Sequence, residues 1–390
     1  MLVLHLSTTP QVGAPGEICR ALRLCADVQA RWAVLQTDVG AYGRMAFELD
    51  LLWESDREEI IDLAERCDVL HLHNFLDLNS TAFDPIDIRQ RWDRGGAIVR
   101  HFHSTPALIA KVMKLDEQAV HDCPIPKLAI AQYPERFIPK ARLVPNIVNL
   151  PTTPVPRATG QIRIGYAPSR FNSARSSRWD TKGYPETIKL LKNVQRRGRR
   201  LGLHVEVDII EQVSHSECLA RKSTCHIIVD DLATGSYHLN TLESLAAGSV
   251  VVAYVDRRTL SAVHDVTGRS DFPVIIAGLE DADEVLFELC RQPTLVAEAG
   301  MRSREWMAQY WNPRVMADHF VRAYMDVLEQ PRAGFMARHD ESLAAKWEAV
   351  GQHDVLWHSR MRRWPRLAPT WWTGLRATAG RLARLAALKK

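Results

Sequence analysis

Short apolar segments that alternate with helix-like segments constrain the fold of this chain more than any other feature. Over the first 150 residues such segments begin at Leu2, Trp32, Asp68, Ala97, Lys127 and Ala141. A second series follows residue 160 and begins at Ile162, His204, Cys225, Ser249 and Phe272. Apolar runs of strand length, each followed by a helical segment, are typical of parallel sheets with helical crossovers. The sequence therefore predicts an α/β protein with two doubly wound, Rossmann-like domains.

The stretch PTTPVPRATG at residues 151–160 predicts a linker between the two series, because it is rich in proline and poor in apolar residues. We therefore expect one domain over residues 1–150, a second over residues 161–330, and a C-terminal extension over residues 331–390. Apolar residues at helical spacing between Arg304 and Glu329 predict a helical segment that closes the fold. Two such domains facing one another place the carboxyl ends of their strands along one cleft, where open α/β sheets bind ligands.

The composition favours a cytoplasmic protein. The chain has 390 residues and is 46% hydrophobic, which is enough for two domain cores. No stretch approaches the roughly 20 uncharged apolar residues of a membrane-spanning helix, and residues 1–6 contain no basic leader. The 7 cysteines are scattered and lack C-x-x-C spacing, which favours reduced core thiols over metal ligands.

The tail from Trp357 to Lys390 is basic, rich in tryptophan and amphipathic. It contains nine arginine or lysine residues and no acidic residue, so it accounts for the net charge of +4. Leu375, Ala379, Leu382 and Ala386 share one helical face, away from most of the arginines. This pattern favours an anionic membrane surface and hence a peripheral position on the inner face of the cytoplasmic membrane. A solvated tail, or one docked on a partner or on nucleic acid, is the alternative.

We expect no nucleic-acid partner for the tail. Single-strand binding needs a folded groove with aromatic platforms, which this segment does not suggest.

A carboxylate, Glu243, lies in the stretch GSYHLNTLESLAAGSVVVAY, after the apolar segment that begins at Cys225. Asn240, Thr241 and Glu243 fit a helix start in which Asn240 is the cap and Glu243 completes a capping box. The same helix follows a glycine-bearing loop at the edge expected to face the cleft. A carboxylate there can accept both hydroxyls of a ribose, and free backbone N–H groups suit a phosphate. Both interpretations of Glu243 remain open at this point.

Histidines gather on two neighbouring segments of the first domain. His71 and His73 are two residues apart and share a strand face, and His101 and His103 do the same on the next strand. We expect no metal there, because no nearby carboxylate or cysteine completes a convincing ligand set. Satisfied core histidines and ligand-binding histidines are the remaining interpretations.

Glycines and cations follow the first strand of each domain. Gly13 and Gly16 let a backbone approach a phosphate or an acceptor closely, although a plain turn fits equally well. In the second domain, Arg170 of APSRF and Lys182 of the dipeptide KG can neutralise a diphosphate, or they are ordinary surface cations.

These motifs together resemble the donor site of GT-B glycosyltransferases of the family 4 type. LESLAAGSVVV is similar to the family's LEAxAxGxPVV, and IVDDLATGSYH is similar to the loop that precedes it. The family's E-x7-E pair places its second glutamate at Glu243, whereas its first falls on Gly235. The resemblance assigns the nucleotide ribose to Glu243 and leaves the transferred sugar unassigned. It implies that the donor is bound by Gly235, Ser236, Tyr237, Asn240, Thr241 and Glu243.

The resemblance also implies a catalytic set of His103, Arg170 and Lys182. The family has an arginine and lysine clamp on the donor diphosphate, and here NSARSSRWDT lengthens the gap between the two, so Arg175 or Arg178 could replace Arg170. FHST resembles the family's histidine beside the transferred sugar, which points to His103. A similar glycine-rich loop implies acceptor or phosphate contacts at Gly13, Gly16 and His73.

The implied function is the transfer of a sugar from a nucleotide sugar, such as a UDP- or GDP-sugar, to an acceptor bound by residues 1–150. The family precedent is retention of configuration, with no metal and no other cofactor. The tail suits a lipid-linked or polysaccharide acceptor in envelope or exopolysaccharide assembly. The alternatives are a GT-B nucleotide-sugar epimerase and a catalytically silent GT-B-like binding subunit. The stereochemistry, the identity of a base and the oligomeric state do not follow from the residues.

Overall fold

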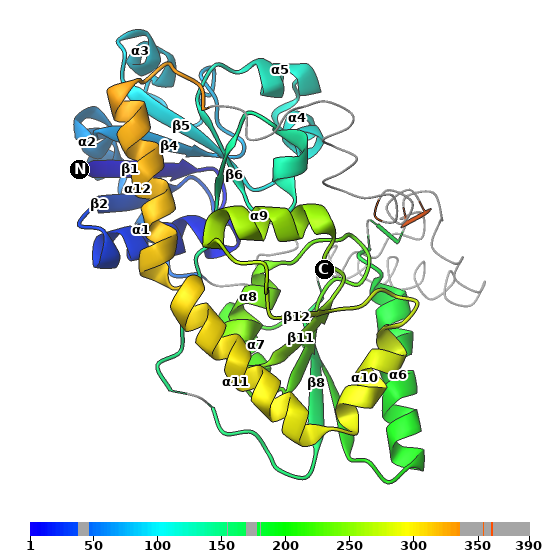
Figure 1. The fold of residues 1–390 in the computed structure, drawn as a ribbon. Coiled ribbons are helices and arrows are strands. Elements are labelled where there is room, and N and C mark those ends of the chain that lie inside the picture. Colours follow the sequence, from blue (N-terminus) through cyan, green and yellow to red (C-terminus); the bar gives the residue numbers. More distant parts are fainter. Residues whose placement is uncertain are drawn as a thin grey trace, which may run out of the picture.

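The two predicted α/β domains are confirmed in a computed structural model, which describes residues 1–37, 47–153, 155–168, 178–179, 181–335, 354 and 360–361. Figure 1 shows two sheets, one above the other, each with helices packed around it. The first sheet has seven strands in the order β3-β2-β1-β4-β5-β6-β7, and the second has five in the order β12-β11-β10-β8-β9. Every strand pair is parallel.

The strands of the first sheet follow the first series of apolar segments. They are β1 (Leu2–Ser7), β2 (Gln29–Val34), β3 (Leu51–Leu52), β4 (Val69–His73), β5 (Ala97–Phe102), β6 (Lys127–Ile130) and β7 (Arg142–Val144). The analysis of the sequence missed β3, because two residues are too few to show a pattern. The helices are α1 (Ala14–Cys25), α2 (Arg57–Arg66), α3 (Ile88–Asp93), α4 (Pro106–Met113) and α5 (Glu117–Asp122), with the 3-10 turns η1 (Gln11–Gly13) and η3 (Pro134–Phe137).

The second sheet follows the second series. Its strands are β8 (Ile162–Tyr166), β9 (Val205–Ile209), β10 (Ile227–Val229), β11 (Val250–Ala253) and β12 (Val274–Ile276). Its helices are α6 (Tyr184–Arg200), α7 (His215–Ser223), α8 (Leu239–Ala246), α9 (Arg257–Thr267), α10 (Ala282–Cys290) and α11 (Pro293–Tyr310). The central strands β10 and β11 are short and wholly buried, as expected for a parallel sheet covered on both faces, whereas the edge strands β9 and β12 are partly exposed.

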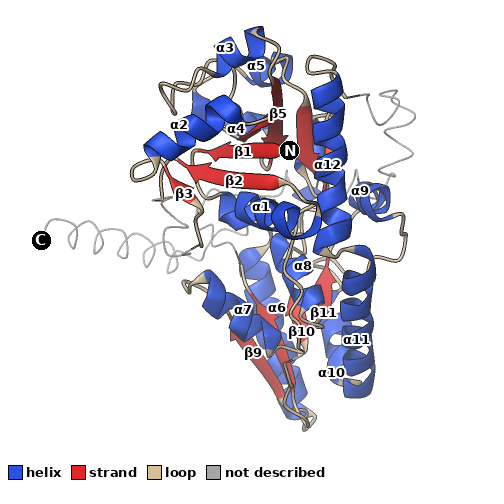
Figure 2. Ribbon diagram, turned by 90° about the vertical axis from the view of Figure 1, so that its left-hand side faces the viewer, coloured by secondary structure: helices blue, strands red, loops and turns tan. Residues whose placement is uncertain are grey.

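The last described helix, α12 (Pro313–Glu329), belongs to the first domain in space although we expected it within residues 161–330. A short break separates α11 from α12. Asn312 caps the start of α12, because its side chain accepts a hydrogen bond from the Val315 N–H at 3.1 Å. From there α12 packs against α1, β5 and β7 and buries Phe320 and Tyr324 completely. Figures 1 and 2 show α12 lying along the first sheet while α11 stays on the second.

The faces of the first sheet differ in what covers them. Val3, Val69 and Val99 pack with α1 and α12, while Leu4 and Leu70 pack with α2 and α3 on the other face. Side chains two residues further along each strand lie on the same face as these valines, so His5, His71 and His101 also project toward α1 and α12.

Between the domains, the described residues of the predicted linker form neither helix nor strand. Arg157 fastens this segment to the second domain by donating to the carbonyl oxygens of Gly248 and Ala247, both at 2.8 Å. Arg304 of α11 donates to the Pro151 carbonyl oxygen at 2.7 Å.

No helix among the described residues is long and apolar enough to cross a membrane. The amphipathic tail predicted from Trp357 onward lies outside the described residues, apart from Arg360 and Met361. All 7 cysteines are free thiols.

Candidate active site at the domain boundary

Two aspartates at the end of β10 hold the loop that leads into α8. The Asp231 carboxylate accepts hydrogen bonds from the backbone N–H groups of Ala233 at 2.8 Å and Thr234 at 2.9 Å. The Asp230 carboxylate accepts from the Thr241 hydroxyl at 2.5 Å and from the His238 N–H at 3.2 Å. Both carboxylates are buried, so the start of α8 is fixed from the preceding strand.

Lys182 and His238 meet where the amino ends of α6 and α8 come together. The Lys182 Nζ lies 2.7 Å from His238 Nε2, and His238 is the cap residue of α8. Lys182 directly precedes Gly183, the cap residue of α6, which has a left-handed φ of 68°. The first N–H groups of a helix have no partner within the helix, so two helix starts beside an ammonium group suit a phosphate.

Neighbouring side chains keep the buried Asp230 carboxylate in its charged form. Burial alone would raise the pKa of Asp230, but His238, the Thr241 hydroxyl and Lys182 together lower it below its ordinary value. Asp230 therefore stays ionised and orients His238, whose Nδ1 lies 3.5 Å from the carboxylate.

Glu243 is held by two basic side chains of α7. Its Oε1 lies 2.8 Å from His215 Nε2, and its Oε2 forms an ion pair with the buried Lys222. Burial would raise the pKa of Glu243, but the Lys222 charge and the His215 hydrogen bond more than offset it, so the pKa is lowered. His215 also contacts the Phe47 ring of the first domain, at 5.5 Å between ring centroids. A Cβ at Gly13 would lie only 2.8 Å from the Phe47 ring. The predicted glycine turn therefore lies on one side of the contact between Phe47 and His215, and Glu243 lies on the other.

The predicted capping box is wrong. Helix α8 begins at Leu239 with His238 as the cap residue, no side chain caps it, and its first turn contains no acidic residue. Asn240 is inside the helix, and Glu243 is its fifth residue. The Asp230 carboxylate takes the part expected of Glu243, because it accepts the N–H of the cap residue, His238, from the end of β10. Within the described part of the chain, both polar atoms of the Asn240 amide are buried without a hydrogen-bond partner.

Gly235, Ser236 and Tyr237 contact the first domain. The Tyr237 side chain is fully buried and its hydroxyl donates to the Ala131 carbonyl oxygen. The Ser236 hydroxyl donates to the Gln132 carbonyl oxygen at 3.0 Å. The structure therefore uses the Ser236 and Tyr237 side chains to join the domains, and leaves only backbone groups of this stretch to touch a ligand.

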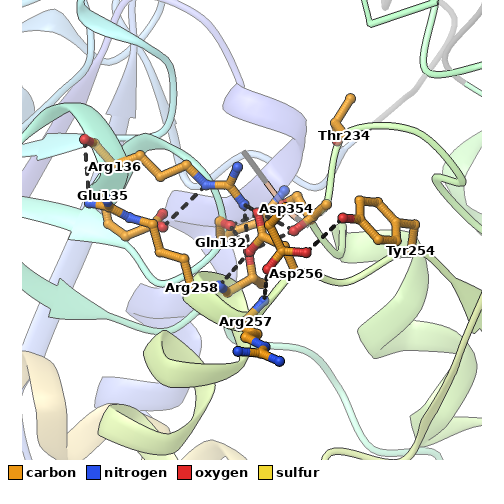
Figure 3. Close-up of polar contacts among 12 residues, drawn as sticks. Gln132, Glu135, Arg136, Thr234, Tyr254, Asp256, Arg257, Arg258 and Asp354 are labelled. Carbon is orange, nitrogen blue, oxygen red and sulfur yellow. Dashed lines mark hydrogen bonds and ion pairs between the residues drawn. The ribbon is translucent and has the colours of Figure 1, made fainter. Parts of the chain in front are cut away.

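An arginine of the first domain, Arg136, contacts Gly235 and the start of α9. The Arg136 guanidinium, from η3, donates to the Gly235 carbonyl oxygen at 2.9 Å and to the Thr259 hydroxyl at 2.7 Å, and pairs with Asp256 at 2.7 Å. Asp256 caps α9 by accepting from the Thr259 N–H at 2.8 Å. Figure 3 shows Arg136 and Asp256 pointing toward one another from the two domains. Sequence reasoning missed this pair because its members are 120 positions apart.

Further polar groups surround that ion pair. Asp354 accepts from the Tyr254 hydroxyl at 2.9 Å and from the Arg257 N–H at 3.1 Å. The Glu135 carboxylate is buried nearby, and burial raises its pKa more than the charges of Arg136 and Arg258 lower it.

Five histidines form one cluster on the first sheet, which we call the histidine cluster: His5, His71, His73, His101 and His103. Sequence reasoning found four of them and missed His5, which β1 places beside His71 in register. His5 Nδ1 lies 3.0 Å from His73 Nε2, and His73 Nδ1 lies 2.9 Å from His103 Nε2.

Tyr324 of α12 joins the inner end of the cluster. Its hydroxyl lies 2.7 Å from His71 Nδ1 and 3.2 Å from His5 Nε2. Burial lowers the pKa of His5 and of His103 to about 3, and it lowers the pKa of His71, His73 and His101 well below the ordinary value. The five imidazoles are therefore neutral near pH 7.

His103 lies at the outer, half-buried end of the cluster. Asn74 fixes its backbone by accepting from the His103 N–H at 2.7 Å, and the Asn74 amide donates to Gln11 at 2.7 Å and to Ser104 at 3.1 Å. The loops after β1, β4 and β5 are thus tied together around the predicted sugar-binding histidine. Nothing in the sequence marked Asn74 or Gln11.

The other residues that the sequence predicted for the site differ in where the structure places them. Arg170 and Arg175 lie outside the described residues, and Arg178 pairs with Glu186 at 3.0 Å. Gly16 serves packing, because a Cβ there would lie 2.8 Å from the Trp32 ring. Lys182, in contrast, lies beside the start of α8, and its predicted role as a diphosphate clamp stays a prediction.

Comparison with known proteins supports the architecture. The chain is similar to the sucrose-phosphate synthase of Thermosynechococcus elongatus, with a TM-score of 0.52 and 12% identity over 84% of this chain and 99% of that chain. It is also similar to an alpha-glucosyltransferase solved with UDP-glucose and DNA containing an abasic site, with a TM-score of 0.55 and 11% identity over 84% and 99% of the two chains. The sequence itself matches no protein-family model and no curated protein.

Two parallel sheets, a linker and a last helix that returns to the first sheet define a two-domain protein of the Rossmann-like class. The chain has the GT-B fold. The alpha-glucosyltransferase was solved with DNA, which conflicts with our expectation of no nucleic-acid partner, so the fold gives no reason to exclude one.

Proposed function

We propose that this protein is a glycosyltransferase that moves a sugar from a nucleotide sugar to an acceptor at the boundary of its two domains. The observation that carries the proposal is the Glu243 carboxylate, kept ionised and held in one orientation by His215 and Lys222 beside the first domain. Two hydrogen bonds leave a carboxylate with free acceptor positions, which suit the two hydroxyls of a ribose. The Glu243 side chain keeps 11% of its surface exposed.

The groups around Glu243 support binding of the rest of the donor. Lys182 and the amino ends of α6 and α8 suit the diphosphate, and the unpaired Asn240 amide offers a donor and an acceptor to a polar ligand. A lysine that neutralises the departing nucleoside diphosphate stabilises the charge that develops as the glycosidic bond to phosphate breaks. The transfer step that we propose needs no metal at this position, and the configuration at the sugar is retained, as in the enzymes that the donor motif resembles.

On the other side of the boundary, His103 is the proposed contact for the transferred sugar. Its Nε2 faces His73, and among the described residues its Nδ1 has no hydrogen-bond partner, so Nδ1 can bond a sugar hydroxyl or the acceptor. We propose a glycan or a lipid-linked glycan as the acceptor, with the basic tail at the membrane surface.

A thermal-shift screen tests the donor site. The full chain is heated with UDP, GDP, ADP, UDP-glucose or GDP-mannose, and we expect one base to raise Tm clearly above the others. Glu243→Gln should remove most of that rise. Glu217→Gln is the matched control, because Glu217 is an exposed carboxylate near the start of α7, the helix that packs beside Glu243. Absence of any shift in the wild type contradicts the donor site.

Turnover tests the reaction. Hydrolysis of the stabilising sugar nucleotide, increased by a glycan or lipid-linked acceptor, supports the transferase. Epimerisation of the free sugar nucleotide without acceptor identifies the epimerase instead, and stabilisation without any turnover identifies a binding subunit. An oligonucleotide as acceptor is included, and transfer to it alone replaces the proposed acceptor class.

A further inference from the structure

The geometry points to a site for a borderline divalent metal ion, of which Zn²⁺ is the type, held by His73, His101 and His103. The nearest nitrogens of these three side chains all lie within 4.8 Å of one another. Three nitrogens around one zinc, each about 2.0–2.1 Å from the ion, lie about 3.4 Å apart in tetrahedral geometry. Small side-chain rotations therefore bring the three imidazoles onto one ion.

His101 is the member that ordinary core packing does not explain. It is fully buried, and within the described part of the chain neither of its ring nitrogens has a hydrogen-bond partner. A neutral imidazole carries one N–H donor and one acceptor nitrogen, so both are left unsatisfied at a cost in stability. A metal ion accepts the lone pair of one nitrogen and removes part of this cost.

The outer position of this triad distinguishes it from the second triad in the cluster, His5, His71 and His73. That inner triad lies deeper, and Tyr324 already bonds both His5 and His71. His103, in contrast, is half-buried and gives an ion a route from the domain boundary. Three protein ligands also leave a fourth position open toward that route.

The neighbours of the triad suit a bound metal. His73 contacts His5 at 3.0 Å through the nitrogen that does not face His103, and Asn74 fixes the His103 backbone. Such outer contacts set the ring orientation of metal-binding histidines. Three imidazoles without a carboxylate prefer Zn²⁺, Co²⁺, Ni²⁺ or Cu²⁺ to Mg²⁺ or Ca²⁺.

An ion there would join the ends of β4 and β5 and fix the orientation of His103. It shares His103 with the proposed contact for the transferred sugar but contains neither Lys182 nor Glu243, which lie on the other domain, and the proposed transfer step does not pass through the ion.

Metal binding by the full chain tests the site. The protein is purified without a polyhistidine tag, treated with a chelator and titrated with Zn²⁺ or Co²⁺. We expect one equivalent of zinc by atomic emission, a higher Tm, and visible cobalt absorption of tetrahedral type. Replacing His101 by Gln or His103 by Gln should abolish stoichiometric binding, whereas the exposed His204→Gln variant binds as the wild type does.

The outcomes are distinct. His101→Gln removes a buried ring, so circular dichroism checks its folding, and the half-buried His103→Gln gives the same test with less structural risk. Failure of the folded wild type to bind an equivalent of zinc overturns the site, as does unchanged binding by both variants. Intense near-ultraviolet absorption of the cobalt form, which marks thiolate ligands, also overturns it because the triad contains no cysteine.

Discussion

The two domains place polar clusters at equivalent points, the carboxyl ends of their central strands, yet the clusters have opposite electrostatics. The histidine cluster of the first domain contains four buried bases, the half-buried His103 and no acid, so burial lowers the pKa of each and all are neutral near pH 7. In the second domain Asp230 is buried and Glu243 is mostly buried, but Lys182, Lys222 and neighbouring histidines keep them ionised. Burial alone thus neutralises a site, and burial with a counter-charge preserves its charge.

This electrostatic difference suits the two domains to different ligand groups. Ionised groups and helix amino ends in the second domain suit the charged, nucleotide part of a donor. Neutral imidazoles in the first suit hydroxyl groups and borderline metal ions.

Removing one counter-charge gives the largest expected effect. In Lys222→Met the Glu243 carboxylate loses its buried ion-pair partner, and the free energy of unfolding should fall by about 3 kcal/mol in urea denaturation. The double variant Lys222→Met with Glu243→Gln should recover much of that loss, because no unpaired charge remains. Lys189→Met, an exposed change on α6, is the control. An unchanged midpoint in Lys222→Met would mean that the charges of the second cluster do not depend on one another.

The next effect concerns catalysis. Lys182→Ala should lower donor hydrolysis about 100-fold, because it removes the cation beside the diphosphate, while Tm without ligand changes little. Lys192→Ala, an exposed lysine of α6, controls for the loss of a surface charge. Equal hydrolysis by Lys182→Ala and the wild type would remove Lys182 from the site.

The pH dependence of the unfolding free energy tests whether Glu243 stays ionised in the folded protein. The ordinary pKa of Glu243 is 4.5 and folding lowers it, so the ion pair stabilises the protein fully above the ordinary value and this contribution is lost as the pH falls through the folded value. Below pH 4.5 the wild type should therefore lose up to about 1.4 kcal/mol per pH unit more than Glu243→Gln. Measurement of unfolding free energies from neutral to acidic pH checks this. Parallel curves for the two proteins contradict the lowered pKa.

The smallest effect belongs to the first domain. Tyr324→Phe removes the hydroxyl that bonds His71 and His5 but keeps the ring, and should cost about 1 kcal/mol in unfolding free energy. Tyr310→Phe on α11, whose ring is only partly buried, is the matched control. If both variants are as stable as the wild type, α12 is held on the first sheet by apolar packing alone.

Sequence patterns predicted the sheets well and the site in part. Buried parallel strands are continuous apolar runs, so 11 of the strands could be found from the sequence, and β3 was too short. Glu243 was found because it lies in a recognisable motif, and four histidines because they lie two apart on strands. The cap of α8 was misassigned because Asp230, the carboxylate that reaches the helix start, belongs to the preceding strand end rather than to the helix.

The sequence by itself determined the two α/β domains, because burial on a sheet follows from residues that are neighbours in the chain. Only the tertiary structure decided which polar groups meet. His5 and His73 are 68 positions apart and lie 3.0 Å from one another, and His71 and Tyr324 are 253 positions apart and lie within 2.7 Å. The crossing of α12 back to the first sheet makes the second contact. No local period encodes such pairs, since their energies depend on burial and on charges that arrive from distant segments.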